Sequence, residues 1–113
     1  VETGRAVAFI MDDIIEAGLV AQSRAPQEYE IGSVALSAEP YGIMVRKDDK
    51  EFKAFVDKTM TQIYKSGQIN AIWEKWFQKP IPPKGVNMHL PMTAAFKKVV
   101  AKPTDSGDPK DYE

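Results

Sequence analysis

The sequence predicts a mixed α/β fold built in layers, and two kinds of segment support this prediction. Continuous apolar runs over residues 6–11 and 41–46 are typical of strands buried on both faces of a sheet. Between residues 50 and 77, apolar residues recur at the spacing of helices that bury one face. Such strands and helices bury their apolar surfaces by packing in layers against each other.

The first strand, expected over residues 6–11, runs directly into two carboxylates, Asp12 and Asp13. A helix is expected over about residues 13–23, with Asp12 or Asp13 as its N-cap. In open α/β sheets, ligands bind at the carboxyl ends of strands, beside helix N-termini. The search for a functional site therefore begins at this acid pair.

Three further extended segments are expected downstream. Residues 29–34 alternate weakly and predict a second strand, and residues 36–39 are extended because Pro40 restrains its predecessor. The apolar run over residues 41–46 predicts a third strand. Three strands do not complete a doubly wound sheet, and Val1–Gly4 has the character of a helix end. Partner elements are therefore expected to lie outside this chain.

Amphipathic helices are expected in the middle of the chain. Asp48, with Glu51 three residues later, fits an acid-headed capping box. The first apolar stripe consists of Phe52, Phe55, Val56, Met60 and Ile63. Ser66 and Gly67 are expected to break this helix. A second apolar stripe ends before Pro80 and consists of Ile69, Ile72, Trp73, Trp76 and Phe77.

The C-terminal third is expected to hold one short helix. The proline-rich residues 80–85 predict an extended surface connection. Apolar residues between 92 and 100 predict the helix, with Pro91 near its start. From Pro103 onward the sequence is polar and contains proline and glycine, which predicts a flexible tail over residues 103–113.

Composition excludes several classes of protein. The 113 residues give room for one small domain, and a 43% hydrophobic content allows a packed core. A formal net charge of -1 leaves no basic excess for binding nucleic acid through bulk charge. Cysteine is absent, which excludes disulfides and thiolate sites. No apolar run approaches the ~20 residues of a membrane span. Because the chain starts at Val1, the lack of a targeting signal says little about its compartment.

Three strings of sequence stand out: GRAVAFIMDD over residues 4–13, EPYGIMVRKDD over 39–49 and WFQKPIPPK over 76–84. In this order and at this spacing, they resemble the C-terminal part of glutamate/aspartate-binding proteins. These proteins are periplasmic solute-binding components of ABC transporters and belong to bacterial extracellular solute-binding family 3. The resemblance extends to about residue 102.

The resemblance implies a type II periplasmic-binding fold, in which two α/β lobes clamp an amino acid between them. Residues 1–36 would be the C-terminal part of the second lobe, and residues 37–43 the hinge or return crossover. Residues 44–102 would be the C-terminal part of the first lobe. The chain would then lack the N-terminal portion of such a protein. The implied protein is a periplasmic binding protein, not an enzyme, without a cofactor. Its implied partners are L-glutamate or L-aspartate and an ABC permease.

Asp12 has two interpretations. From spacing alone, helix capping is the commoner role for an acid here, and it contributes ~0.5–2 kcal/mol. An amino-acid ligand, however, carries an ammonium group, for which an ionised carboxylate is a strong acceptor. The resemblance implies that Asp12 binds this ammonium group while Asp13 caps the helix.

The other candidate residues carry weaker signals. Small residues suit a hinge, although an ordinary loop has the same composition; here they are Ser37, Ala38 and Gly42. Selectivity for an acidic ligand calls for arginine, but no arginine matches a family position among Arg5, Arg24 and Arg46. His89 has no nucleophile or metal partner at useful spacing, and the acid pairs lack a third metal ligand.

Two rival functions remain at this stage. An enzyme resembling the dehydratases of this superfamily would use Asp12 as a general acid or base. The helix N-terminus behind Asp12 favours its anion, which speaks against that role. Alternatively, the chain is a truncated fragment that does not bind ligand and self-associates through apolar surface, such as that of Trp73 and Trp76.

Overall fold

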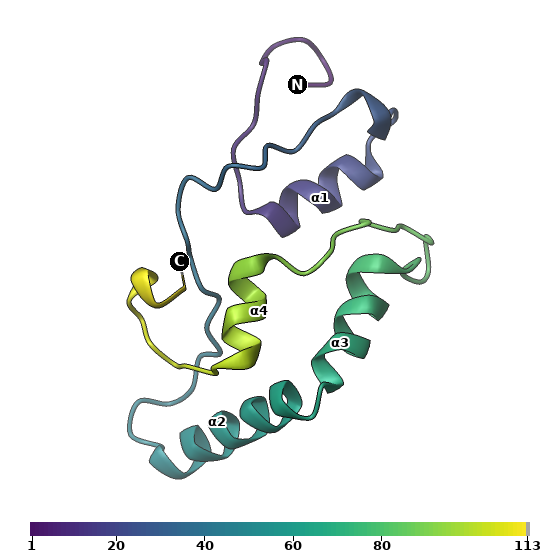
Figure 1. The fold of residues 1–113 in the computed structure, drawn as a ribbon. Coiled ribbons are helices and arrows are strands. Elements are labelled where there is room, and N and C mark those ends of the chain that lie inside the picture. The colour runs from purple at the N-terminus through teal and green to yellow at the C-terminus, as the bar shows by residue number, and fades with distance from the viewer. Residues whose placement is uncertain (113) are drawn as a thin grey trace. The chain divides into compact units, whose positions relative to one another are not determined.

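The computed structural model describes residues 1–112, which form two compact units (Figure 1). Unit 1 is Val1–Ser33 with Lys75–Pro91, and unit 2 is Val34–Glu74 with the residues from Met92 onward. Unit 1 contains α1 (Asp13–Gln22) and the 3-10 turn η1 (Pro26–Glu28). Unit 2 contains α2 (Lys50–Lys65), α3 (Gln68–Trp73), α4 (Ala94–Ala101) and the 3-10 turn η3 (Pro109–Tyr112). The π-helical turn η2 (Glu74–Gln78) directly follows α3.

Helix α2 forms where the apolar spacing predicts it, but its cap differs from the expectation. The Asp49 side chain, not that of Asp48, accepts a hydrogen bond from the Phe52 backbone N–H at 2.9 Å. The capping side chain bonds to the third residue of the helix, and because α2 begins at Lys50, Asp49 has that spacing. The predicted break is confirmed: Gly67 has φ +77°, a left-handed conformation that favours glycine.

Replacing Asp49 with alanine is expected to lower the free energy of unfolding by about 1 kcal/mol, because the Phe52 N–H loses its acceptor. Asp48→Ala is the matched control, since it removes an adjacent acid without removing the cap. Urea unfolding followed by circular dichroism measures both changes. Equal losses of unfolding free energy in the two variants would show that Asp48 and Asp49 stabilise α2 through charge alone.

The core of unit 2 forms where α4 meets the two preceding helices. Trp73 and Ile69 are buried, with 7% and 9% of their surfaces exposed. The Phe96 ring of α4 lies 4.9 Å from the Trp73 ring and 6.1 Å from the Tyr64 ring, centroid to centroid. Thr93 begins α4 by accepting a hydrogen bond from the Phe96 N–H at 3.1 Å. The predicted role of Trp73 as a core residue is therefore confirmed.

Unit 1 is organised around the small residues of α1. Ala17 and Gly18 are buried. A Cβ atom built on Gly18 would lie 3.7 Å from the Met88 methyl group, in ordinary van der Waals contact. After η2, the chain turns between Ile81 and Val86, where the Ile81 N–H donates to the Val86 carbonyl at 2.8 Å. The proline-rich connection predicted to be extended over residues 80–85 instead forms this turn.

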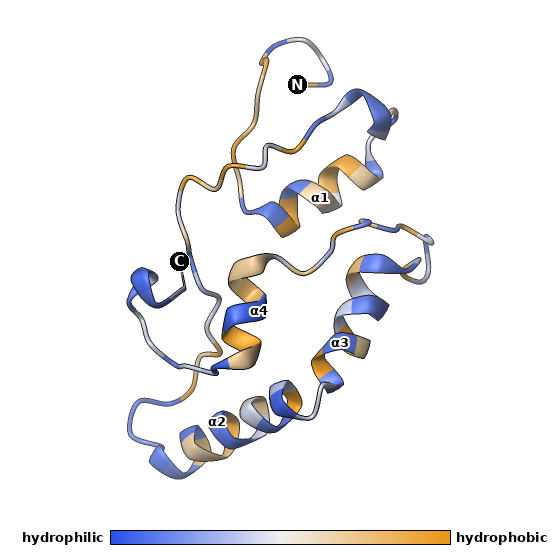
Figure 2. Cartoon of the chain, viewed as in Figure 1, coloured by the Kyte–Doolittle hydropathy of each residue, from blue (hydrophilic) through white to orange (hydrophobic). Residues whose placement is uncertain are grey.

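The predicted strands over residues 6–11, 29–34 and 41–46 are not formed. Within residues 1–112 the structure contains one isolated bridge, between Ile81 and Val86, and no strand. The segment before α1 contains hydrophobic residues (Figure 2), and its side chains are exposed, with Val7 at 101%. A strand forms only when a neighbour satisfies its backbone groups and covers its side chains. No described segment pairs with these three segments in a sheet, so none of them forms a strand.

The residues expected to form a flexible tail contain regular structure. Turn η3 contacts α4, and the Tyr112 hydroxyl donates a hydrogen bond to the Ser106 carbonyl. Glu113, the last residue of the expected tail, lies outside the described residues. Among residues 1–112, none of the helices combines the length and the apolar character that crossing a membrane requires.

Candidate functional site

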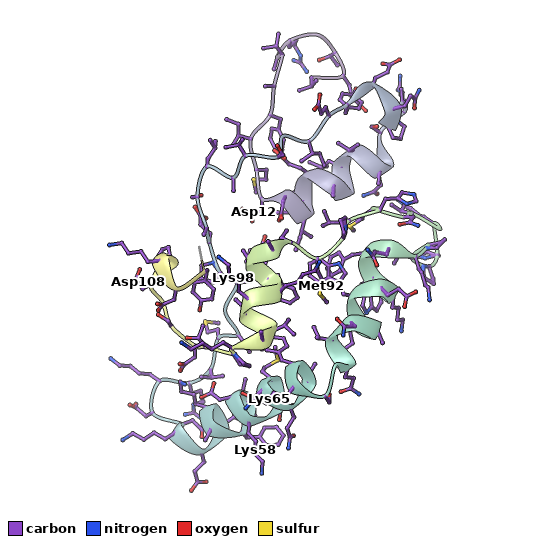
Figure 3. All side chains as sticks on the ribbon, viewed as in Figure 1. Asp12, Lys58, Lys65, Met92, Lys98 and Asp108 are labelled. Atoms are coloured by element: carbon purple, nitrogen blue, oxygen red, sulfur yellow. The ribbon has the colours of Figure 1, made fainter. Side chains whose placement is uncertain are left out.

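Asp12 lies at the N-terminal end of α1, where the exposed apolar run meets the helix (Figure 3). It is the N-cap residue by backbone geometry, and its carbonyl accepts a hydrogen bond from the Glu16 N–H at 2.9 Å. Its side chain is half-buried and makes no capping hydrogen bond to the helix. The Asp12 carboxylate is therefore not committed to capping α1.

The neighbouring acids bond to the backbone that surrounds Asp12. The Asp13 carboxylate accepts from the Ile14 N–H at 2.7 Å, and Glu16 accepts from the Met11 N–H at 2.9 Å. Asp13 is thus the first residue of the helix and not its N-cap residue, which corrects the division of roles expected from the sequence. The physical reason is that the helix begins one residue earlier than that division assumed, so Asp13 bonds the N–H of Ile14 inside the first turn and Glu16 bonds that of Met11, just before the N-cap.

Three carboxylates therefore surround the start of α1: Asp12, Asp13 and Glu16. The positive end of the helix dipole stabilises anions at this position. Because Asp13 and Glu16 hold backbone N–H groups, they fix the chain on both sides of Asp12. The result is a small anionic site whose chemistry suits a cation with several N–H donors, such as a primary ammonium group.

The predicted hinge residues lie in an extended segment of unit 2. Ser37 is exposed, and its hydroxyl donates to the Glu39 carboxylate at 3.1 Å. Ala38 is half-buried, while a Cβ built on Gly42 would meet no atom within 4 Å. Side-chain packing therefore restrains this segment little, which is compatible with rotation of its backbone.

The remaining candidate residues make local hydrogen bonds. Arg5 Nε donates to the Thr3 hydroxyl at 3.2 Å, and the Arg46 carbonyl accepts from the Asp49 N–H at 3.2 Å. His89 is exposed with φ 51°, and its N–H donates to Asn87 Oδ1 at 2.9 Å. In the part of the chain that the structure describes, no group of three His, Asp or Glu side chains could hold a metal ion.

Residues 5–79 match the family model of bacterial extracellular solute-binding proteins, family 3. The chain belongs to this family. The match covers more than half of the sequence and includes Asp12, the expected hinge and helices α1, α2 and α3. The family assignment made from the three strings is therefore confirmed, and with it a two-lobe periplasmic-binding fold for the family.

Curated relatives sharpen this family-3 assignment. The chain is 50% identical over 104 residues to the L-glutamate/L-aspartate-binding protein of Pseudomonas aeruginosa. It is 43% identical, over the same length, to the glutamate/aspartate import solute-binding protein of Escherichia coli and to its namesake from Salmonella typhimurium. Each match covers 92% of this chain but 34% of the relative. The chain thus spans about a third of the length of these relatives.

These relatives bear on the rival functions. All three are named as binding proteins, and the family is described as solute-binding. A dehydratase-like enzyme is therefore not supported for this family-3 chain. Because at most nine residues lie outside each match, residues 10–104 fall within it, including Asp12 and the expected hinge.

Sequence reasoning missed two features of this family-3 chain. One is the bond from Glu16 back to the Met11 N–H, although an acid in the first helical turn was a signal for it. The other is the ion-paired cluster in which Lys53 contacts both Asp57 and Asp105. The four-residue spacing of Lys53 and Asp57 could have indicated the first contact. No sequence signal pointed to Asp105, which lies 52 residues away.

Proposed function

We propose that this chain supplies part of a periplasmic binding protein that captures an acidic L-amino acid for an ABC import permease. The observation that carries the proposal is 50% identity to an L-glutamate/L-aspartate-binding protein across 92% of the chain. Glutamate and aspartate are therefore the ligands to test, and the permease is the partner that would receive them. The extracellular description of the family supports the periplasmic location.

In this proposal, Asp12 binds the ammonium group of the ligand. Its carboxylate is half-buried at the start of α1 and makes no capping bond, while Asp13 and Glu16 hold the adjacent backbone. A hydrogen bond between an ammonium and a carboxylate is roughly twice as strong as a neutral one. Asp12 would therefore give affinity and orientation, but not preference for an acidic side chain.

Selectivity for the acidic side chain requires a cation elsewhere. Arg5 donates to the Thr3 hydroxyl within its own turn, and Arg46 lies in the turn before α2. In a two-lobe protein the arginines that bind the ligand's carboxylates would come from residues that this chain does not contain. The chain would therefore contribute the ammonium site and depend on the remainder of the binding protein for selectivity.

Ligand capture would proceed by hinged closure of the two lobes. Residues 1–36 would belong to the second lobe, residues 37–43 to the hinge, and residues 44–102 to the first lobe. Ser37, Ala38 and Gly42 would absorb the backbone rotation, since their side chains are small and weakly packed. A ligand that contacts both lobes only in the closed state shifts the equilibrium toward closure.

Calorimetric titration with L-glutamate and L-aspartate tests the proposal on two proteins. One is this chain alone, and the other is a hybrid protein that joins the first two thirds of the Pseudomonas relative to this chain. We expect micromolar or tighter binding by the hybrid protein and none by the chain alone. A folded hybrid protein that binds neither amino acid would contradict the proposed function. Binding by the chain alone would contradict the division of the site between two parts.

Self-association is a second candidate, favoured by one observation. The apolar run before α1 is exposed, with Phe9 at 58% and Ile10 at 74%. Unpaired extended segments of this kind readily add to another copy. Analytical ultracentrifugation decides the point, because a monomer at high concentration would exclude this candidate.

A further inference from the structure

The C-terminal residues Pro103–Tyr112 hold their own shape through side-chain bonds to the backbone. Three alternate residues of this stretch accept a hydrogen bond from the N–H two positions later, at 3.0–3.1 Å: Thr104, Ser106 and Asp108. Such bonds stabilise turns without help from a helix or sheet. The segment is therefore a series of turns, each held by one side-chain bond to the backbone.

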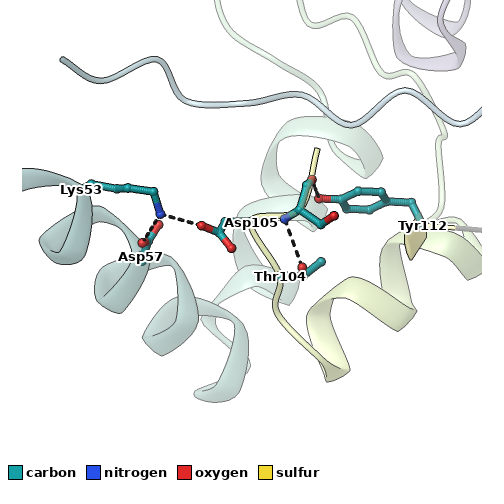
Figure 4. Close-up of polar contacts among 6 residues, drawn as sticks. Lys53, Asp57, Thr104, Asp105 and Tyr112 are labelled. Atoms are coloured by element: carbon teal, nitrogen blue, oxygen red, sulfur yellow. Dashed lines mark hydrogen bonds and ion pairs between the residues drawn. The ribbon is translucent and has the colours of Figure 1, made fainter. Parts of the chain in front are cut away.

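One longer-range contact ties this segment to α2, and a second contact closes the segment on itself (Figure 4). At one end, Lys53 Nζ lies 2.5 Å from the Asp105 carboxylate and 2.7 Å from that of Asp57, and both pairs are exposed. The pKa of the Asp105 carboxyl is lowered by its hydrogen bond with Lys53. At the other end, the Tyr112 hydroxyl donates to the Ser106 carbonyl at 2.5 Å.

The segment lies against the helices of unit 2. Turn η3 contacts α4, and a hollow between them is lined by Lys98, Val99, Lys102, Thr104 and Asp111. Burial raises the pKa of the Tyr64 hydroxyl, and the nearby Tyr112 raises it further. Tyr64 belongs to α2 and packs on Phe96 of α4. The segment therefore lies close to the line where α2 and α4 meet.

We propose that Pro103–Tyr112 is a clasp that joins α2 to α4 and opens as one unit. The Lys53–Asp105 ion pair holds it to α2, η3 holds it to α4, and the Tyr112 hydroxyl closes the segment on the Ser106 carbonyl. This clasp lies beyond residues 5–79, the part matched by the family model. Opening would release η3 from α4 and expose Tyr64 to water. Because the ion pair is exposed, salt would screen it and favour the open state.

Amide hydrogen exchange of the full chain, measured by NMR, tests the clasp. The informative amides are those of Ser106, Asp108 and Lys110, because opening of the segment as one unit would break all three of their turn bonds together. Asp105→Asn should lower the protection factors of all three together by about 1.5- to 5-fold, the range for an exposed ion pair. Tyr112→Phe should lower the same three by about two- to tenfold, since it removes one hydrogen bond.

Asp57→Asn is the matched control, because it removes the other acid that Lys53 contacts but leaves the pair with Asp105. It should leave the three protection factors unchanged, and ~1 M salt should abolish the difference between the wild type and Asp105→Asn. The pKa of Tyr64 should fall toward its ordinary value in Asp105→Asn. Unchanged protection in both clasp variants would overturn the proposal. Protection lost at single amides, and not at all three, would overturn opening as one unit.

Discussion

Trp73→Ala is expected to lower the free energy of unfolding by about 3–5 kcal/mol, the range for removing a buried aromatic side chain. Trp73 is 7% exposed and its ring packs 4.9 Å from that of Phe96, so truncation leaves a cavity between α3 and α4. Folded domains are stable by only about 5–15 kcal/mol, and small ones lie at the low end. Urea unfolding followed by circular dichroism should therefore show most of the stability of unit 2 lost.

Trp76→Ala is the matched control for this prediction. Trp76 is 45% exposed, and the Lys75 ammonium lies 5.0 Å from its ring centroid. An exposed cation–π contact of this kind contributes about 0.5–1 kcal/mol, so the loss on truncation should be several times smaller than at Trp73. Similar losses for the two variants would show that the Trp73–Phe96 contact does not form the core.

The helices of this chain could be predicted from the sequence because their signals are local. Apolar residues at helical spacing marked α2, and Gly67 marked its end through a conformation that other residues adopt only with strain. The choice between Asp48 and Asp49 as the cap was less predictable. It depends on where the first helical residue falls, and adjacent acids fit almost equally well.

The prediction of strands was wrong for a physical reason that no local sequence pattern reveals. The apolar run over residues 6–11 has strand composition, but pairing needs a second segment whose backbone groups face it. The same dependence on distant residues hid the Lys53–Asp105 contact, because neither residue has a local signal for the other. The apolar runs thus indicated that these segments have side chains suited to burial in a sheet. They did not indicate whether the chain contains a second segment to pair with them.

For the candidate site, the sequence predicted its position better than the separate roles of the acidic side chains. The acid pair after an apolar run correctly located the start of α1, where Asp12 is the N-cap residue but its side chain makes no capping hydrogen bond. Asp13 was expected to be the N-cap residue. Its carboxylate instead accepts a hydrogen bond from the Ile14 N–H, and the Glu16 carboxylate accepts one from the Met11 N–H. Those details depend on backbone angles within one turn, which the residue types alone do not specify.

In the hybrid protein, Asp12→Asn is expected to weaken glutamate binding by at least about thirtyfold. Removing one member of a desolvated charge pair costs about 2–5 kcal/mol, because the ligand's ammonium group stays buried without its counter-charge. Asparagine preserves the size of the side chain and keeps one acceptor oxygen, so the loss reports the charge. Calorimetric titration with glutamate at constant pH measures the dissociation constant for both proteins.

Asp13→Asn separates ligand binding from helix stability in the same titration. It removes an equal charge one residue away, from a side chain that accepts a hydrogen bond from the Ile14 N–H. If Asp12 contacts the ammonium group directly, Asp13→Asn should change glutamate affinity by less than about threefold, the scale of a screened surface charge. Equal losses of affinity for the two variants would mean that the acids act through the general field at the start of α1. Urea unfolding of both variants shows whether either loss reflects a change in the stability of the helix.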